Sequence, residues 1–286
     1  MITISVVICT RNRVASLTTV LDRYRDLLSD PGWDMVVVDD GSADTTAAEI
    51  DCRRPNFLGR LTLVRTGGLG LGAARNLGWR TATGSLILFT DDDCYPSPDL
   101  LSHLRACFDS EAVAFVGGRL LPFDEEDAAV AVVTRDWRVD LGGPQFVPAG
   151  LIAGANFTVR RSALSTVGGF DPEFGAGTSF PAEDVELVAR LLVAGFRGSY
   201  DPRPTVWHHH GRRTAASREA LRRSYDHGRG AYYAKSLGNP VLRWRYLRAW
   251  TRSAWRGSWR GAWREVRGAA HYWARARTRT EVSVNG

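Results

Sequence analysis

The sequence predicts an α/β fold in which helices flank a mainly parallel β-sheet. Over the first 90 residues, short apolar runs of strand length alternate with segments of helical periodicity. Polar or charged residues directly follow three of these apolar runs. Strands that alternate with helices pair in parallel through right-handed crossovers, so their carboxyl ends meet at one edge. Open α/β sheets bind ligands at that edge, where we therefore expect the functional site.

The first predicted strand covers residues 2–9 and ends in the polar loop 10–13. We expect Ser16 to cap the following helix, because a serine hydroxyl can accept from a free backbone N–H group. The apolar face of that helix has helical spacing and contains Leu17, Val20, Leu21, Tyr24, Leu27 and Leu28. Residues 35–38, 61–64 and 86–89 are the next three strands, and helices connect them.

Three consecutive aspartates, Asp91, Asp92 and Asp93, follow the fourth predicted strand. Adjacent carboxylates repel one another, so such a run needs either solvent or a cation. Asp91 and Asp93 point to the same side of an extended chain and can reach one divalent ion, or one ion and a ribose. A solvated turn is the alternative, because aspartate is common in turns.

The other strand ends supply the groups that a nucleotide needs. The first strand ends in Thr10 and Arg11. The second strand ends in Asp39 and Asp40. Acids can accept from a base and a ribose, and arginine binds phosphate. Turn and helix-capping roles for the two aspartates are the alternative.

The glycine-rich segment 67–78 precedes a predicted helix but does not match the dinucleotide-binding fingerprint. It lacks the third fingerprint glycine, and it follows the third strand instead of the first. We interpret it as a loop that brings the backbone and Arg75 close to a ligand at the helix N-terminus.

Eight short motifs extend this pattern over residues 2–210. They are VVICTRNR at 6–13, VVDDGS at 37–42, GAARNLG at 72–78, FTDDD at 89–93, GANF at 154–157, GGFD at 168–171, ED at 183–184 and VWH at 206–208. In this order they resemble the nucleotide-sugar-dependent glycosyltransferases of family 2, which have the GT-A fold. The resemblance implies a Rossmann-like, mixed but mainly parallel sheet flanked by helices. The C-terminal tail departs from the simplest family pattern, and its own sequence predicts one or two helices from Val241 onward.

The resemblance also implies a division of the chain. Residues 1–118 would bind the nucleotide sugar, and residues 119–212 would form the acceptor-binding and catalytic half of the same domain. Beyond the resemblance, the composition of residues 213–286 predicts a basic helical region rich in Trp and Arg. The implied donor-binding residues are Thr10, Arg11, Asp39, Asp40, Arg75, Asp91, Asp92 and Asn156.

The resemblance implies a metal site of Asp91, Asp93 and His208 for Mn²⁺ or Mg²⁺ on the donor diphosphate. Such an ion neutralises the charge that develops on the departing nucleoside diphosphate. Imidazole is a suitable third ligand for Mn²⁺. Three consecutive histidines follow Trp207, and His208 is preferred over His209 and His210.

Glu183 and Asp184 open a predicted helix with the apolar face Val185, Val188, Leu191 and Leu192. Capping of that helix is one interpretation, because its dipole favours acids in the first turn. The other is a general base that takes the proton from an acceptor hydroxyl. The resemblance selects Asp184 as this base, with Glu183 as the second choice, and implies one-step displacement with inversion.

The loops of the second half should determine the acceptor. Residues 122–150 are irregular, and their acidic run 124–127 is most simply a solvated loop. Residues 152–159 are expected to form a strand that carries Asn156, and residues 168–172 a tight turn. Residues 175–178 are either a lid over the acceptor or an ordinary surface loop, since small residues allow closure.

The tail carries the positive charge of the chain. Residues 241–286 contain 11 arginines and two acids, whereas the remainder has a small excess of acids. Arginine recurs every fourth residue from Arg248 to Arg264, as does tryptophan from Trp255 to Trp263. On one or two helices these would form adjacent stripes, which suits contact of residues 241–280 with an anionic membrane. Packing on the catalytic domain, a homodimer contact and nonspecific nucleic-acid binding are the alternatives.

Composition limits the other possibilities. We expect no signal peptide, because the chain runs directly into its first strand, and no apolar run reaches the roughly 20 residues of a membrane span. The four cysteines have no paired spacing, which favours free thiols in a reducing cytoplasm. We therefore expect a cytoplasmic protein, with peripheral contact at the inner face of the membrane as a hypothesis. The net negative main domain argues against a specific nucleic-acid partner.

The sequence thus predicts an inverting, metal-dependent glycosyltransferase of the hexosyltransferase type. A UDP-sugar is the favoured donor, and dTDP- and GDP-sugars stay open. The acceptor hydroxyl would belong to a glycan, a lipid-linked glycan, a peptide or a small metabolite. The alternative is a non-catalytic scaffold of the same fold that binds a nucleotide sugar or a glycan.

Overall fold

The computed structural model describes residues 2–256 and 258–284, and one nine-stranded sheet forms the centre of the molecule. The strands are β1 (Ile4–Thr10), β2 (Trp33–Asp39), β3 (Leu61–Arg65), β4 (Leu86–Asp91), β5 (Cys94–Pro96), β6 (Val113–Pro122), β7 (Val139–Gly142), β8 (Asn156–Arg160) and β9 (Arg197–His208). Their order is β3-β2-β1-β4-β8-β6-β9-β5, with β7 paired to β9.

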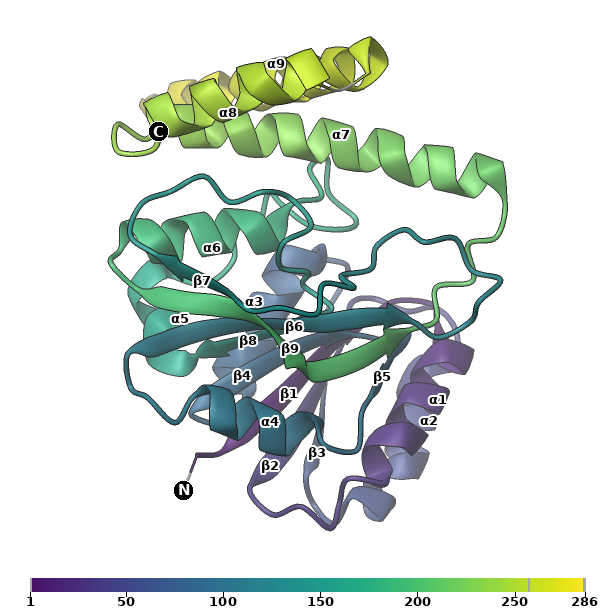
Figure 1. Ribbon diagram of the computed structural model, residues 1–286. Helices are drawn as coiled ribbons and strands as arrows, with labels where there is room; N and C mark the ends of the chain where they lie inside the picture. The colour runs from purple at the N-terminus through teal and green to yellow at the C-terminus, as the bar shows by residue number, and fades with distance from the viewer. Residues whose placement is uncertain (1, 257, 285–286) are drawn as a thin grey trace.

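Helices lie on both sides of this sheet, and the last three form a separate layer (Figure 1). The helices are α1 (Val14–Arg25), α2 (Thr46–Arg53), the 3₁₀ helix η1 (Arg54–Phe57), α3 (Leu71–Thr81), α4 (Leu100–Cys107), α5 (Arg161–Val167), α6 (Glu183–Val193), α7 (Ala215–Gly238), α8 (Arg243–Arg256) and α9 (Trp259–Val284). The predicted apolar faces are buried within α1 and α6, but Leu27 and Leu28, which were expected on the first helix, follow its end at Arg25, and Leu28 is only partly buried. All four cysteines are free thiols.

The first half of the sheet is parallel, as the sequence predicts. β1 pairs in parallel with β2 and β4, and β2 pairs in parallel with β3. In this register Thr10 lies beside Asp39, and Cys9 lies beside Asp91. The polar strand ends therefore meet at one edge of the sheet, where they can face one ligand.

The second half makes the sheet mixed. β8 lies between β4 and β6 and is antiparallel to both, whereas β6 and β9 are parallel. The expected boundary at residue 118 falls inside β6, so the two expected halves share one sheet. This continuity brings the second half of the chain to the edge that carries the aspartates.

Two predicted element boundaries are wrong. Helix α1 begins at Val14 with Arg13 at its N-cap, so Ser16 lies inside the first turn and does not cap the helix. The predicted strand 152–159 begins only at Asn156. Before it the chain turns, and the N–H of Asn156 donates to the carbonyl of Ala153 at 3.1 Å. Ile152 is fully buried in that turn, so its apolar character reflects the core and not a strand.

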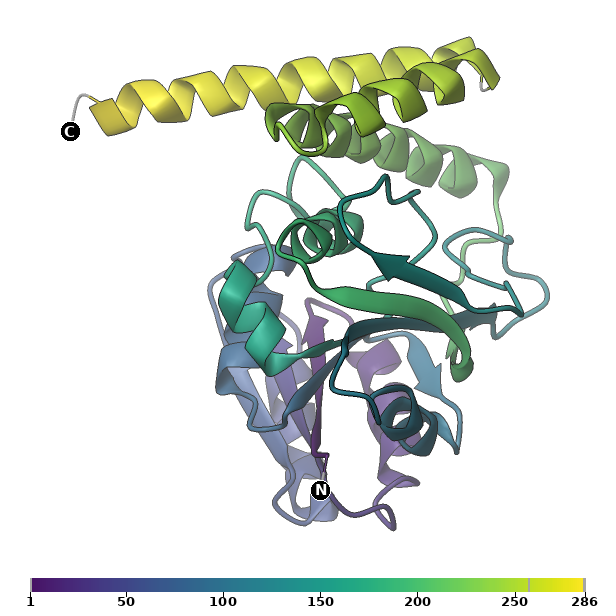
Figure 2. The same ribbon diagram turned by 60° about the vertical axis from the view of Figure 1, so that its left-hand side comes forward.

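The tail is helical, as the sequence predicts, and of the two expected arrangements, one helix or two, the structure has two. The chain turns back between α8 and α9, so the arginines and tryptophans of the predicted stripe lie on two helices (Figure 2). Helix α9 packs on α7 and α8, and its Glu265 accepts from Arg229 of α7 at 2.6 Å and from Trp250 of α8 at 2.7 Å. Packing within the protein, one of the alternatives, thus accounts for part of the tail. Among the described residues, no helix combines the length and the apolar character needed to span a bilayer.

Candidate active site

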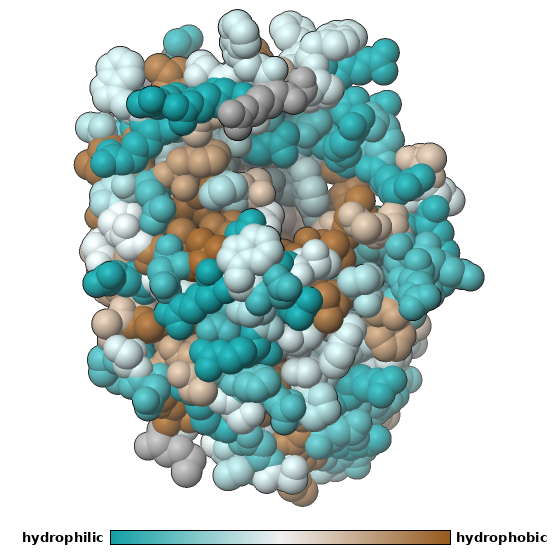
Figure 3. Space-filling view, viewed as in Figure 1, coloured by the Kyte–Doolittle hydropathy of each residue, from teal (hydrophilic) through white to brown (hydrophobic). Residues whose placement is uncertain are grey.

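A cavity of about 740 Å³ lies where the carboxyl ends of β1, β2 and β4 approach α6 and α7. The face shown in Figure 3 is hollowed below the helical layer, and apolar side chains border the opening. The sheet contributes Asp40 and Asp91 to its wall, and α6 contributes Asp184. Apolar groups, including those of Leu120 and Val133, form another part of the wall. The cavity thus combines a charged floor with an apolar side.

Arg13 holds two of the three consecutive aspartates at the cavity floor. Its guanidinium lies 3.2 Å from a carboxylate oxygen of Asp92 and 2.7 Å from one of Asp93. The hydroxyl of Thr10 donates to Asp92 at 2.6 Å. Burial raises the pKa of Asp92 to about 7, although Arg13 and Thr10 stabilise its charged form. Thr10 therefore positions a carboxylate of the protein, and both residues line the cavity wall.

Asp93 is held in its ionised form. Burial alone would raise its pKa, but the contacts with His208 and Arg13 outweigh burial and hold the pKa well below the usual range. The Nε2 atom of His208 lies 3.3 Å from Oδ1 of Asp93. An ionised carboxylate beside an imidazole nitrogen is a suitable pair of ligands for a divalent ion.

The hydrogen bonds of His208 fix the side of the ring that faces Asp93. Its Nδ1 lies 2.9 Å from the carbonyl oxygen of Ala131, and a carbonyl can only accept, so Nδ1 carries a proton. In the neutral ring, Nε2 then carries a lone pair that faces the carboxylate of Asp93. Both atoms are hydrogen-bond acceptors and repel each other unless a proton or a cation lies between them. The raised pKa of His208, which Asp93 produces against the effect of burial, has the same origin.

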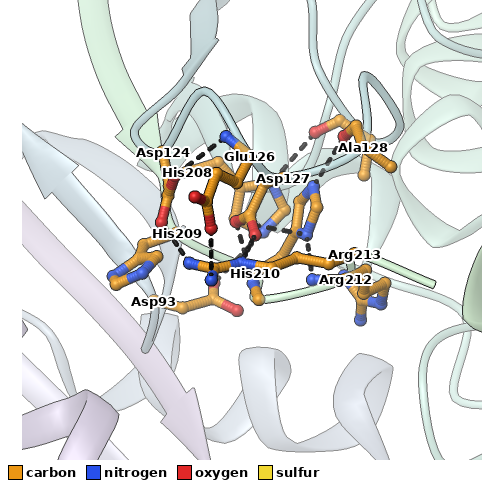
Figure 4. Close-up of polar contacts among 12 residues, drawn as sticks. Asp93, Asp124, Glu126, Asp127, Ala128, His208, His209, His210, Arg212 and Arg213 are labelled. Carbon is orange, nitrogen blue, oxygen red and sulfur yellow. Dashed lines mark hydrogen bonds and ion pairs between the residues drawn. The ribbon is translucent and has the colours of Figure 1, made fainter.

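The other two histidines have structural partners. Nδ1 of His209 lies 3.0 Å from the hydroxyl of Tyr95, and its ring packs against Tyr95 and Phe123. His210 donates from Nε2 to the carbonyl of Ala128 at 3.1 Å and accepts the N–H of Arg212 at Nδ1. Of the three imidazole rings, only that of His208 contacts the carboxylate of Asp93, whereas His209 reaches Asp93 through its backbone N–H, which donates to the Asp93 carbonyl at 2.8 Å. Figure 4 shows the three histidines with Asp93.

The acidic run 124–127 is only in part the solvated loop that the sequence suggests, because Glu125 and Glu126 are exposed but the loop is tied down by ion pairs. Arg213 binds Asp124, Glu126 and Asp127, and Asp127 also accepts the N–H of Gly211 at 2.9 Å (Figure 4). Asp127 is buried. These contacts fasten the loop to the segment that carries the three histidines. Local sequence gives no sign of them, because the partner arginine lies more than 80 residues away.

Arg75 joins two groups of acids that are distant in the sequence. Its guanidinium donates to Asp91 at 2.9 Å and to Glu183 at 2.8 Å, and it reaches the carbonyl of Gly154 at 3.2 Å. The side chain is only 2% exposed and lies over the ring of Phe170. The structure therefore pairs Arg75 with carboxylates of the protein, whereas the sequence suggested contact with the nucleotide.

Asp184 lies directly beside this link. Its carboxylate accepts the N–H groups of Gly154 at 2.9 Å and Val185 at 2.7 Å. Burial raises the pKa of both Glu183 and Asp184, and both side chains line the cavity. Because Arg75 binds Glu183, Asp184 is the member of the pair without an ionic partner among the described residues.

The predicted nucleotide-binding acids differ in their placement. Asp40 lines the cavity and accepts the N–H groups of Leu69 at 2.6 Å and Gly70 at 2.9 Å. These bonds and that of Thr66 outweigh burial and lower its pKa. Asp39 is buried, accepts the N–H of Ser42 at 2.9 Å and is not part of the cavity wall.

Asn156 has a structural role in place of the predicted contact with the donor. Its amide nitrogen donates to the carbonyls of Arg119 at 2.9 Å and Pro204 at 3.0 Å. The side chain is fully buried and does not line the cavity. Asn156 fastens β6 and β9 where their register shifts, because the backbone groups there lack regular strand partners.

Among the cavity residues that the sequence analysis did not identify are three arginines and a tyrosine: Arg13, Arg212, Arg229 and Tyr225. Arg13 lies in the same polar loop as Arg11, so the strand-end pattern could have identified it. Tyr225 and Arg229 lie on α7, and no motif marks that helix. Within the described residues, the side chain of Arg212 has no hydrogen-bond or ionic partner, which leaves it available to an anion. Arg11 is likewise exposed at the cavity edge.

The donor set fits a hard divalent ion better than a soft one. Ligand atoms of Asp93, Cys94 and His208 lie within 4.8 Å of one another. Burial raises the pKa of the Cys94 thiol well above its usual value, so the sulfur stays protonated and is a poor ligand. Asp93 and His208 then offer oxygen and imidazole ligands, which suit Mn²⁺ or Mg²⁺. Asp91, the third predicted ligand, lines the same cavity but is not part of this group, and its carboxylate binds Arg75.

Comparison with known proteins gives one consistent family. The family model of glycosyl transferase family 2 matches residues 5–168. The pre-mycofactocin glycosyltransferase of Mycobacterium tuberculosis is 31% identical over 219 residues, which are 72% of this chain and 43% of that protein. The validoxylamine A glucosyltransferase of Streptomyces hygroscopicus is 27% identical over 223 residues, or 67% of this chain and 52% of that protein. The chain thus spans about half the length of these relatives.

Solved structures show the same fold. A mannosyltransferase from Pyrobaculum calidifontis, in complex with GDP-Man and Mn²⁺, has a TM-score of 0.64 and 21% identity over 94% of this chain and 80% of that one. Residues 1–349 of TarS from S. aureus, in complex with UDP-GlcNAc, have a TM-score of 0.62 and 16% identity over 85% of this chain and 69% of that one. The GT-A fold implied by the sequence motifs is confirmed.

Proposed function

Because the chain belongs to glycosyl transferase family 2, we propose that it transfers a sugar from a nucleoside-diphosphate sugar to an acceptor hydroxyl. One observation carries the proposal. Arg75 connects Asp91, at the end of β4, to Glu183, at the start of α6, with distances of 2.9 and 2.8 Å. The acids expected to hold the donor and the acid expected to activate the acceptor therefore line one cavity.

The donor diphosphate is proposed to bind in the cavity beside Asp93 and His208, with Asp91, which lines the same cavity, as a further ligand. The ionised state of Asp93 and the orientation of His208 support a divalent ion there, either Mn²⁺ or Mg²⁺. When bound, such an ion supplies Lewis acidity that stabilises the departing diphosphate. The unpaired guanidinium of Arg212 lines the same cavity and is assigned to an anionic oxygen of the diphosphate.

The nucleoside is proposed to lie at the edge of β1 and β2. Arg11 and Asp40 line the cavity there, and Asp40 holds the loop 69–70 in place. UDP is the favoured nucleotide. The similar structures contain GDP-Man in one case and UDP-GlcNAc in another, so the fold accommodates more than one base.

Asp184 is proposed as the general base. Its burial favours a carboxylate that takes up a proton readily, and it has no ionic partner among the described residues. Proton transfer from the acceptor hydroxyl to Asp184 would accompany attack on the anomeric carbon from the side opposite the leaving group. This geometry predicts one-step displacement with inversion, and Glu183 keeps Arg75 in position.

The proposal is tested with the full chain and a panel of UDP-, GDP- and dTDP-sugars, with and without Mn²⁺. At about 100 times the dissociation constant, a donor should stabilise the fold by about 2.7 kcal/mol, which a thermal-shift assay detects readily. We expect a metal-dependent shift with one donor, followed by slow release of its sugar to water. A shift without any turnover would instead indicate the non-catalytic scaffold, and no shift with any donor would contradict the proposal.

A further inference from the structure

A second hollow of about 700 Å³ lies between α7 and α9, outside the catalytic cavity. We call it the α7–α9 groove. Its wall contains the arginines Arg223, Arg260, Arg264 and Arg267 and the tryptophans Trp259 and Trp263. Among the described residues that line it, none is acidic. The groove is therefore strongly basic, whereas the floor of the catalytic cavity is rich in carboxylates.

Half of these arginines are already paired with acids. Glu219 lies 3.0 Å from Arg223 and 2.6 Å from Arg264, and Arg264 also reaches Asp226 at 3.3 Å. These contacts fix the groove wall to α7. They leave little positive charge at Arg223 and Arg264 for a ligand.

Arg260 and Arg267 have no acidic partner within the described ranges 2–256 and 258–284. Both are exposed, and Arg260 lies over the ring of Trp259 at 5.4 Å. Trp259 is 75% exposed and Trp263 is 60% exposed, although both line a hollow. The groove thus presents two free guanidinium groups beside two large flat rings, which suits an anion attached to an apolar or sugar group.

The groove and the catalytic cavity share one wall. Ser224 of α7 lines both hollows. Leu221 and Tyr225 of the same helix face the cavity, whereas Arg223 and His227 face the groove. On the opposite side, Thr178 lines the cavity and the next residue, Ser179, lines the groove. One molecule that passes Ser224 would therefore reach both hollows.

We propose that the α7–α9 groove binds a phosphate or diphosphate group of the acceptor, while the acceptor hydroxyl faces Asp184. The planar guanidinium group of arginine can donate two parallel hydrogen bonds to phosphate oxygens in a bidentate contact. The donor diphosphate belongs to the acid-rich cavity, where a cation balances its charge. An anionic acceptor instead needs a site with free cations, and the groove supplies them. This inference rests on the proposed glycosyl transfer for the identity of the ligand as an acceptor.

The test uses inorganic pyrophosphate as the probe, in EDTA, so that no cation draws it into the catalytic cavity. The double variant Arg260→Gln/Arg267→Gln removes both free guanidinium groups. The matched control Arg248→Gln/Arg252→Gln removes two exposed arginines of α8 that do not line the groove. Calorimetry should show binding to the wild type, a loss of about tenfold or more in the groove variant, and near wild-type affinity in the control. Equal weakening in both variants, or no binding to the wild type, would overturn the proposal.

A second experiment distinguishes binding of a soluble phosphate compound from binding to a lipid surface. Vesicles of phosphatidylglycerol should pellet the groove variant and the wild type equally. If the groove variant loses vesicle binding but keeps its affinity for pyrophosphate, the groove is a membrane contact, and the acceptor assignment is wrong. Binding of the donor in Mn²⁺ should be unchanged in the groove variant. If the wild type binds pyrophosphate but no donor, the proposed function fails while the anion site remains.

Discussion

The catalytic cavity and the α7–α9 groove hold their charges in opposite ways. In the cavity, Asp93 and Glu183 are buried and each has a fixed arginine partner. In the groove, Arg260 and Arg267 are exposed and have no acidic partner among the described residues. Buried charges interact strongly and are little screened, whereas exposed charges are screened by salt within about 8–10 Å. The cavity is thus built to position reacting groups, and the groove to attract an anion.

The strongest test of the cavity is Asp184→Asn. If Asp184 is the base, transfer should fall by about 10³-fold or more, because asparagine cannot take up the proton of the acceptor. Donor affinity should stay within about twofold of wild type, since Asp184 does not contact the proposed metal site. Initial rates and donor titrations measure the two effects separately. Retained turnover in this variant would remove Asp184 from its proposed role.

Arg75→Gln tests whether the buried link holds the cavity together. Loss of the guanidinium leaves Glu183 and Asp91 without their shared partner, and breaking a buried pair costs about 3 kcal/mol or more. Urea unfolding should show this loss. The control Arg25→Gln removes an exposed partner of Asp22 and should cost less than about 1 kcal/mol. Similar losses in both variants would mean that the link has no special importance for stability.

Asp93→Ala tests the metal-dependent part of the cavity. Removal of this carboxylate should weaken donor binding in Mn²⁺ by about 10–100-fold, and His208→Ala should act in the same direction. Donor binding in EDTA should change much less, because the lost interaction involves the metal ion. Titrations that coincide with wild type in Mn²⁺ would refute the metal role. A matched His210→Ala variant should spare donor affinity, since His210 faces Ala128.

The pH dependence of transfer should reveal the buried pair. Burial raises the pKa of Asp184, so its carboxylate is charged above this raised pKa and becomes protonated as the pH falls through it. The value of kcat/KM should therefore decline on the acid side at a pKa above that of an ordinary aspartate, about 3.9. Donor affinity measured over the same pH range separates this effect from titration at the metal site. A decline only at the ordinary value would count against the assignment.

The smallest expected effect concerns the outer face of the helical layer. Trp255 is 93% exposed, so Trp255→Ser should change the free energy of unfolding by no more than about 0.5 kcal/mol. If α8 contacts anionic membranes, the variant should pellet less with phosphatidylglycerol vesicles at low salt. Leu58→Ser, at another exposed apolar residue outside the layer, should pellet like wild type. A wild-type protein that stays in the supernatant would refute the membrane hypothesis.

The sequence by itself determined the elements that depend on local pattern. Apolar runs placed β1 to β4, and helical spacing placed the buried faces of α1 and α6. Polar residues at the strand ends placed Thr10, Asp40 and Asp91 at one edge. These features could be predicted because parallel pairing brings all carboxyl ends of such strands to the same side, whatever the rest of the chain does.

Only the tertiary structure decided which of these residues meet. It paired Arg75 with Asp91 and with Glu183, which is 108 residues away in the sequence. It also placed the side-chain amide of Asn156 where it donates hydrogen bonds to backbone carbonyls. It fastened the acidic run 124–127 to Arg213, and it divided the Arg and Trp stripe between two helices. Each of these contacts depends on packing between segments that are distant in the sequence. A charged side chain has several possible partners, and the packing determines which of them it contacts. Local periodicity carries no information about that choice.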